Sequence, residues 1–135
     1  MRTSRLLPIL FVLGALLIAA PARAQIITAG PPSTLKTASF SLAATGAVVA
    51  AVSGKRIKVY AVRLVVSAAV SVNFRDGAST ALEGAQPLAA NGGFAESVNP
   101  PAFLFATTAG NALDLVISGA GTVSGRVSYW DEDAS

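Results

Sequence analysis

The chain has 135 residues, of which 53% are hydrophobic, and ten basic and seven acidic residues give it a formal net charge of +3. It contains neither cysteine nor histidine. These absences exclude disulfides, cysteine nucleophiles, Ser-His-Asp catalysis and ordinary zinc sites.

The first 24 residues are predicted to be a cleavable secretory signal peptide. Arg2 and Arg5 precede an apolar run over residues 6–20, and Ala22-Arg23-Ala24 is the small-x-small pattern typical of a cleavage site. The alternative is a membrane anchor, but a run of about 15 residues is shorter than the roughly 20 that a spanning helix needs. We therefore expect an exported protein in the periplasm, at the cell surface or outside the cell, without a membrane span in its mature part.

The excess positive charge belongs to this segment. Arg2, Arg5 and Arg23 lie within it, so the remaining chain has seven basic and seven acidic residues. A chain of zero net charge lacks the basic stripe of a nucleic-acid-binding protein, and low net charge favours association. The cluster Lys55-Arg56-Ile57-Lys58 with Arg63 is interpreted as a solvated strand end, and a homo-oligomer is the expected partner.

Residues 25–38 are predicted to form an extended arm or linker, because Gly30-Pro31-Pro32 interrupts any regular element. A single β-domain is expected over residues 39–135. Its first strands are Ser39–Leu42, an apolar run over 47–52, and a β-branched stretch over 55–67. The apolar phase of that stretch slips, which predicts a β-bulge near Tyr60-Ala61.

Later strands follow the same period of two residues. Residues 68–75 alternate cleanly, and shorter strands are predicted over 103–106, 112–118 and 122–130. The glycines of Gly119-Ala120-Gly121 predict a hairpin turn between the last two strands. On this interpretation Leu113, Leu115 and Tyr129 face inward.

Seven to nine short strands separated by turn signals predict an all-β fold, an antiparallel β-sandwich. The density of valines and the glycines at 46 and 54 argue against a helix over 42–52. A jelly-roll-like arrangement is favoured over an immunoglobulin-like one, because the chain lacks Cys…Trp…Cys spacing and has a long irregular segment in its middle.

The sequence indicates no enzyme, no cofactor and no metal site. The candidate carboxylates Asp76, Glu83, Glu96 and Asp114 fall at loop or solvent-facing positions. The run Asp131-Glu132-Asp133 lacks the spacing of a calcium loop and is interpreted as a solvated tail.

Trp130 is the strongest candidate for a functional residue. Strand parity predicts that it faces outward with Arg126, and that Val116 of the preceding strand shares this face. Such a mixed patch suits protein contact, or sugar stacking with Tyr60 as a second aromatic platform. The alternative is a Trp130 side chain folded under the N-terminal arm at the sheet edge.

Five segments carry a resemblance to a known family: Gly54-Lys55-Arg56-Ile57-Lys58-Val59, residues 70–74, 87–93 and 109–113, and Val123-Ser124-Gly125 leading to Tyr129. Residues 54–132 resemble small phage-type jelly-roll structural proteins of the capsid-decoration or fibre type. The resemblance implies a non-enzymatic, often oligomeric module with no catalytic residues to carry over. Capsids assemble in the cytoplasm, so the predicted signal peptide favours a surface protein instead.

Two functions follow as hypotheses. The first is a secreted, non-catalytic structural subunit that self-assembles, with residues 25–38 pairing with the sheet edge of a neighbour. The second is a carbohydrate-binding or adhesion module that uses Trp130 and Tyr60.

Overall fold

The computed structural model describes residues 34–134, so the predicted signal peptide and residues 25–33 of the predicted arm lie outside the described residues. Within this range the chain forms ten strands and no helix, and therefore no helix that could cross a membrane. The strands are β1 (Lys36–Leu42), β2 (Gly46–Val49), β3 (Lys55–Val66), β4 (Val70–Asp76), β5 (Thr80–Ala81), β6 (Gln86–Leu88), β7 (Gly93–Ser97), β8 (Phe105–Ala106), β9 (Leu113–Ser118) and β10 (Val123–Asp133).

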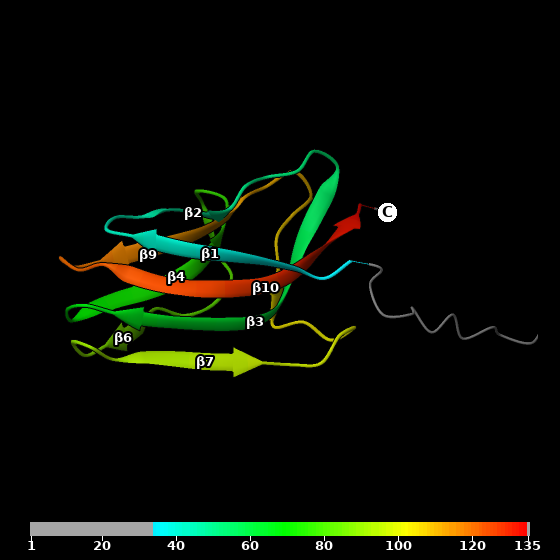
Figure 1. Ribbon diagram of the computed structural model, residues 1–135. Coiled ribbons are helices and arrows are strands. Elements are labelled where there is room, and N and C mark those ends of the chain that lie inside the picture. Colours follow the sequence, from blue (N-terminus) through cyan, green and yellow to red (C-terminus); the bar gives the residue numbers. More distant parts are fainter. Residues whose placement is uncertain (1–33, 135) are drawn as a thin grey trace, which may run out of the picture.

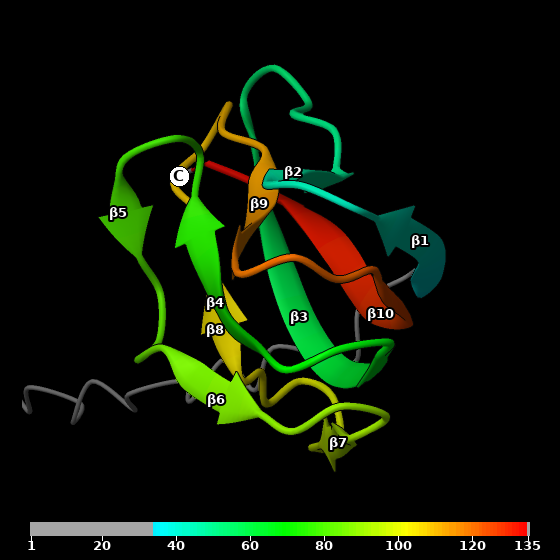
Figure 2. The same ribbon diagram turned by 90° about the vertical axis from the view of Figure 1, so that its left-hand side faces the viewer.

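The strands form two antiparallel sheets that pack face to face (Figures 1 and 2). The first sheet has the order β1-β10-β3-β7, with β8 also paired to β3. The second has the order β2-β9-β4-β5, with β6 also paired to β4. The predicted antiparallel β-sandwich is confirmed. The strand count exceeds the predicted seven to nine because β5 and β8 are two-residue strands.

The core lies between the sheets and is built from the inward rows that alternation predicts. In β4, Val70, Val72 and Phe74 are buried while their neighbours are partly exposed. Leu113 and Leu115 of β9 are fully buried, as predicted. The Phe74 ring stacks on Phe105 from the facing sheet at 5.2 Å between centroids. Burial of these apolar side chains is the main favourable term in the stability of such a fold.

The two longest strands, β3 and β10, form the centre of the first sheet. Their register changes between Ser128, which pairs with Ala61, and Tyr129, which pairs with Val59. Tyr60 is therefore the extra residue of a β-bulge, which confirms the bulge predicted at Tyr60-Ala61.

The predicted hairpin between β9 and β10 is wrong, because β9 belongs to the second sheet and β10 to the first. The connection crosses between sheets beside the β3–β4 connection, to which it is joined by a hydrogen bond of 2.9 Å from the Ser67 N–H to the Thr122 carbonyl. Gly119 has a φ of 122°, a conformation that favours glycine, and a Cβ there would lie 3.1 Å from the Ala69 carbonyl oxygen. The glycine at this position thus allows the chain to turn from the second sheet into the first, where the sequence predicts a hairpin within one sheet.

The domain also begins earlier than predicted. Lys36 to Ala38 were assigned to the arm, but they belong to β1 and pair with β10 without a change of register.

Candidate functional site

The structure does not bring together the predicted patch of Val116, Arg126 and Trp130. Val116 lies on β9 of the second sheet, where it pairs with Asn73 of β4. Arg126 and Trp130 lie on β10 of the first sheet. Outward side chains of two facing sheets point to opposite sides of a sandwich. The predicted patch is therefore wrong, because parity along a strand does not tell which sheet the strand joins.

Trp130 does lie on the outer face, as strand parity predicts, but its side chain is covered. Its pairing with Lys58 places it on the outer face of the first sheet, but only 4% of it is exposed. Tyr60 and Phe103 cover the indole, with ring centroids at 6.0 Å and 6.3 Å. The ammonium group of Lys58 lies 4.8 Å from the centroid of the Phe103 ring. A loop from a distant part of the sequence, which carries Phe103, thus covers Trp130. The alternative of cover by the N-terminal arm concerns mainly residues 25–33, which lie outside the described residues.

This covering loop is fixed to β3 by backbone hydrogen bonds at both of its ends. Val98 donates to the Tyr60 carbonyl at 2.8 Å, and Leu104 donates to the Val59 carbonyl at 2.7 Å. The bulge turns Tyr60 toward Trp130. Together these features make an aromatic cluster that stabilises the outer face near the end of the sheet.

The acidic run Asp131-Glu132-Asp133 forms the last part of β10 rather than a solvated tail. Asp131 pairs with Lys36, and Asp133 lies 2.8 Å from the ammonium group of Lys55. Glu132 lies 2.6 Å from the Lys58 nitrogen and 3.9 Å from Nε of Arg56. The basic cluster at the start of β3 is thereby neutralised. The hydrogen bond to Asp131 also raises the pKa of Lys36 above its ordinary value of 10.5.

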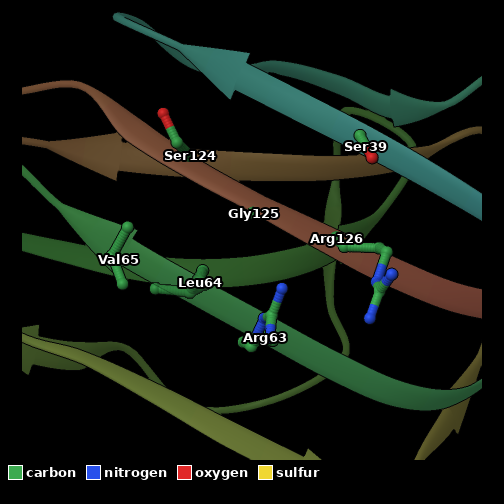
Figure 3. Close-up of a pocket in the computed structure, with 7 residues that line it drawn as sticks. All are labelled: Ser39, Arg63, Leu64, Val65, Ser124, Gly125 and Arg126. Atoms are coloured by element: carbon green, nitrogen blue, oxygen red, sulfur yellow. The ribbon is translucent and has the colours of Figure 1, made fainter.

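Two arginines occupy the middle of the same face. Arg63 of β3 and Arg126 of β10 are directly opposite each other in the ladder, and both are exposed. Neither makes an ion pair within residues 34–134. Figure 3 shows both side chains on one side of the sheet, over the gap between β10 and β3. Side chains directly opposite on antiparallel strands have Cβ atoms about 4.5–5.5 Å apart, so the two charges are near neighbours.

Two shallow hollows adjoin these arginines, and a third lies next to the first of them. The first, of about 480 Å³, lies on the side of Val65 and Ser124. The second, of about 200 Å³, lies on the side of Ala61 and Ser128, and both arginines line both hollows. The third shares Val65 and Ser124 with the first. We call this surface the arginine face; its outward residues are Ser39, Ala61, Arg63, Val65, Ala95, Ser97, Ser124, Arg126 and Ser128.

The chemistry of the arginine face is that of binding. Serine hydroxyls donate and accept hydrogen bonds, and guanidinium groups donate to oxyanions. Glu96 also borders the second hollow, but it pairs with Val62 of the inward row, and its carboxylate acts on Glu83 instead. Sequence reasoning found Arg126 but assigned Arg63 to a strand end. The signal that could have found it was the outward parity of both residues in the two longest strands.

Asp76 and Glu83 make contacts that stabilise the fold. Asp76 is buried and accepts hydrogen bonds from the N–H of Thr108, at 3.0 Å, and from its hydroxyl. Burial alone raises the pKa of Asp76, but the hydrogen bonds from Thr108 and Asn111 outweigh it and leave that pKa below the ordinary value of 3.8. Asp76 thus holds the loop before β9 against the end of β4.

The pKa of Glu83 is shifted in the opposite direction. Its burial, with repulsion from Glu96, raises its pKa above the ordinary 4.5 despite a hydrogen bond from the Gln86 amide. Two carboxylates alone do not make a metal site, and residues 34–134 contain no group of three or more side chains suited to hold a metal ion.

No known protein family and no curated protein matches this chain. Its function is therefore inferred from its own fold and surface.

Proposed function

We propose that this protein is an exported, non-catalytic β-sandwich that self-assembles as the structural subunit of a surface or extracellular assembly. The observation that carries the proposal is the free edge of β1. On this proposal the mature protein consists of residues 25–135, and the copies assemble after export.

We further propose that the sandwich is a jelly roll. Such a fold has eight strands in two sheets, built from two Greek keys. The strand order supports it when β5 with β6, and β7 with β8, each count as one strand, because both members of each pair lie along the same partner. The first sheet then holds the first, eighth, third and sixth strands, and the second sheet holds the second, seventh, fourth and fifth. Jelly rolls are common in capsid and lectin domains, which agrees with the resemblance to phage-type structural proteins.

The β1 strand ends the first sheet and pairs with β10 alone among the described strands. It is seven residues long, runs without a bulge, and carries one charged side chain, Lys36, which is tied to Asp131. Natural edge strands are protected from further pairing by charges, prolines, bulges or short length. The β1 strand has little of this protection, so its backbone groups are available to an incoming strand.

The incoming strand is proposed to be the arm that precedes β1 in a neighbouring copy. It is the segment nearest to this edge in the sequence, and the near-zero net charge of the mature chain favours contact between copies. Each copy would then offer one edge and one arm, which allows a closed ring or an open fibre.

The test compares the chain from Gln25 with a chain that begins at Ser33 and keeps β1 intact. Light scattering and negative-stain imaging should show assemblies for the longer chain and monomers for the shorter one. Thr37→Lys with Ser41→Lys, which places two charges on β1, should also abolish assembly. Ala51→Lys with Ser53→Lys adds the same charge to an exposed loop and should leave it intact. A longer chain that stays monomeric at all concentrations would contradict the proposal.

The alternative function, a carbohydrate-binding or adhesion module that stacks sugars on Trp130 and Tyr60, loses its main support. A stacking platform needs an accessible ring face, and the Trp130 indole is covered by Tyr60 and Phe103.

A further inference from the structure

We propose that the arginine face binds an acidic polysaccharide, with the carboxylate of a uronic acid unit held between Arg63 and Arg126. This site is distinct from the β1 edge and adds a ligand to the proposed assembly. The observation behind it is the position of two cations that make no ion pair within residues 34–134, directly opposite each other on a sheet face lined with hydroxyl groups.

The charges of the first sheet set these two arginines apart. Four basic side chains of this sheet, those of Lys36, Lys55, Arg56 and Lys58, make ion pairs with the acidic end of β10. Arg63 and Arg126 make none within residues 34–134. Like charges directly opposite in an antiparallel pair are destabilising. A bound anion between the two guanidinium groups would remove that cost and gain charge-assisted hydrogen bonds.

The chemistry of the surrounding surface favours a sugar. Guanidinium groups form planar, two-fold hydrogen bonds with carboxylates. Ser39 and Ser124 line the first hollow and Ser97 and Ser128 line the second, so hydroxyl groups lie on both sides of the arginine pair. Because the hollows are open and adjoin one another, an extended chain of sugars can pass over the pair with hydrogen-bond partners on each side.

Other anionic macromolecules fit the face less well. Anionic membranes are bound by clusters of about 4–8 basic residues, and nucleic acids by a basic stripe that contacts many phosphates. The arginine face offers two cations, Arg63 and Arg126, to a ligand. One uronate held between two arginines matches this charge, whereas a membrane surface or a nucleic acid needs more cations than the face offers.

The experiment measures binding of oligogalacturonate to the chain from Gln25 by calorimetry, with a malto-oligosaccharide of equal length as the neutral probe. We expect Arg63→Gln with Arg126→Gln to weaken oligogalacturonate binding at least about tenfold, as the loss of a charge-assisted pair requires. Arg75→Gln removes a cation from β4 of the other sheet and should leave binding unchanged. A thermal midpoint at or above that of the wild type will show that the double variant is folded.

Several outcomes would overturn the proposal. One is equal binding of the malto-oligosaccharide; another is oligogalacturonate binding that the double variant retains. Binding of sodium sulfate as tight as that of oligogalacturonate would reduce the site to a simple anion site. Capture of the protein by vesicles of anionic phospholipid, with no response to oligogalacturonate, would assign the face to a membrane.

Discussion

The β3–β10 ladder consists of two halves that differ in charge, with the bulge at Tyr60 between them. In the half formed by residues 55–59 and 129–133, each basic side chain is neutralised by the acidic end of β10. In the half formed by residues 61–66 and 123–128, Arg63 faces Arg126. The same two strands thus carry a neutralised end that stabilises the fold and a cationic middle that costs stability. The difference teaches that the charges of the middle serve the surface rather than the scaffold, as the proposed ligand site requires.

In the neutralised half, we expect the largest loss of stability from a substitution in the aromatic cluster. Trp130→Ala should cost about 3–5 kcal/mol in the free energy of unfolding, because it leaves a large cavity under Tyr60 and Phe103. Denaturant unfolding measures the loss. Phe103→Ala is the control, because Phe103 is 44% exposed and its truncation should cost less. Equal losses for the two variants would contradict the burial of Trp130.

Asp76, which is held by neutral hydrogen-bond donors and not by a cation, provides a second test of the comparison. Asp76→Ala should cost about 1–3 kcal/mol at neutral pH, because it leaves the donors of Thr108 unsatisfied. The control Asp114→Ala removes a carboxylate that makes no ion pair within residues 34–134 and should cost less.

The effect of Asp76 should also depend on pH. The folded state lowers the pKa of Asp76 below 3.8, so its ionised form is the one stabilised. The contribution is complete above 3.8 and is lost as the pH falls through the folded pKa, where variant and wild type should converge. A gap that widens on acidification would exclude this carboxylate as the cause.

The ion pairs of the neutralised half should have a smaller effect. Glu132→Gln should cost about 0.5–1 kcal/mol, because it leaves Arg56 and the largely covered Lys58 without their carboxylate. The loss should shrink in about 1 M salt, where charges are screened over a few ångströms. The Asp76→Ala loss, which depends on hydroxyl and amide donors, should not shrink in the same titration.

A substitution in the cationic middle should raise the free energy of unfolding instead of lowering it, and by the smallest amount. Arg126→Gln should raise the free energy of unfolding by about 0.2–1 kcal/mol, since it removes the repulsion of Arg63. The gain should disappear in high salt. A loss of stability would mean that Arg126 has a neutralising partner and that the two halves are alike.

Much of the fold follows from the sequence because alternation reports burial directly. The rows of β4 and β9 and the bulge at Tyr60 are readable from the order of apolar residues alone. The cover over Trp130 is not, because it depends on Phe103, which lies in a separate loop far from Trp130 along the chain.

The candidate site was predictable in part for the same reason. Outward parity identifies Arg126, but its partner Arg63 becomes visible only when β10 is known to pair with β3. Val116 was placed beside Arg126 because two consecutive strands were assumed to share a sheet. The neutralisation of Lys55 by Asp133 likewise depends on a pairing that no local pattern reveals.

The place of β1 beside β10 has a consequence for how the chain folds. The Ser41 and Ser124 hydroxyls meet across this pair although they lie 83 positions apart, and the sheet cannot close until the last strand has been synthesised. Closing so long a loop carries an entropic cost that slows folding. We therefore expect a nascent chain that stays unstructured until β10 has been made, which is the state that the proposed export would require.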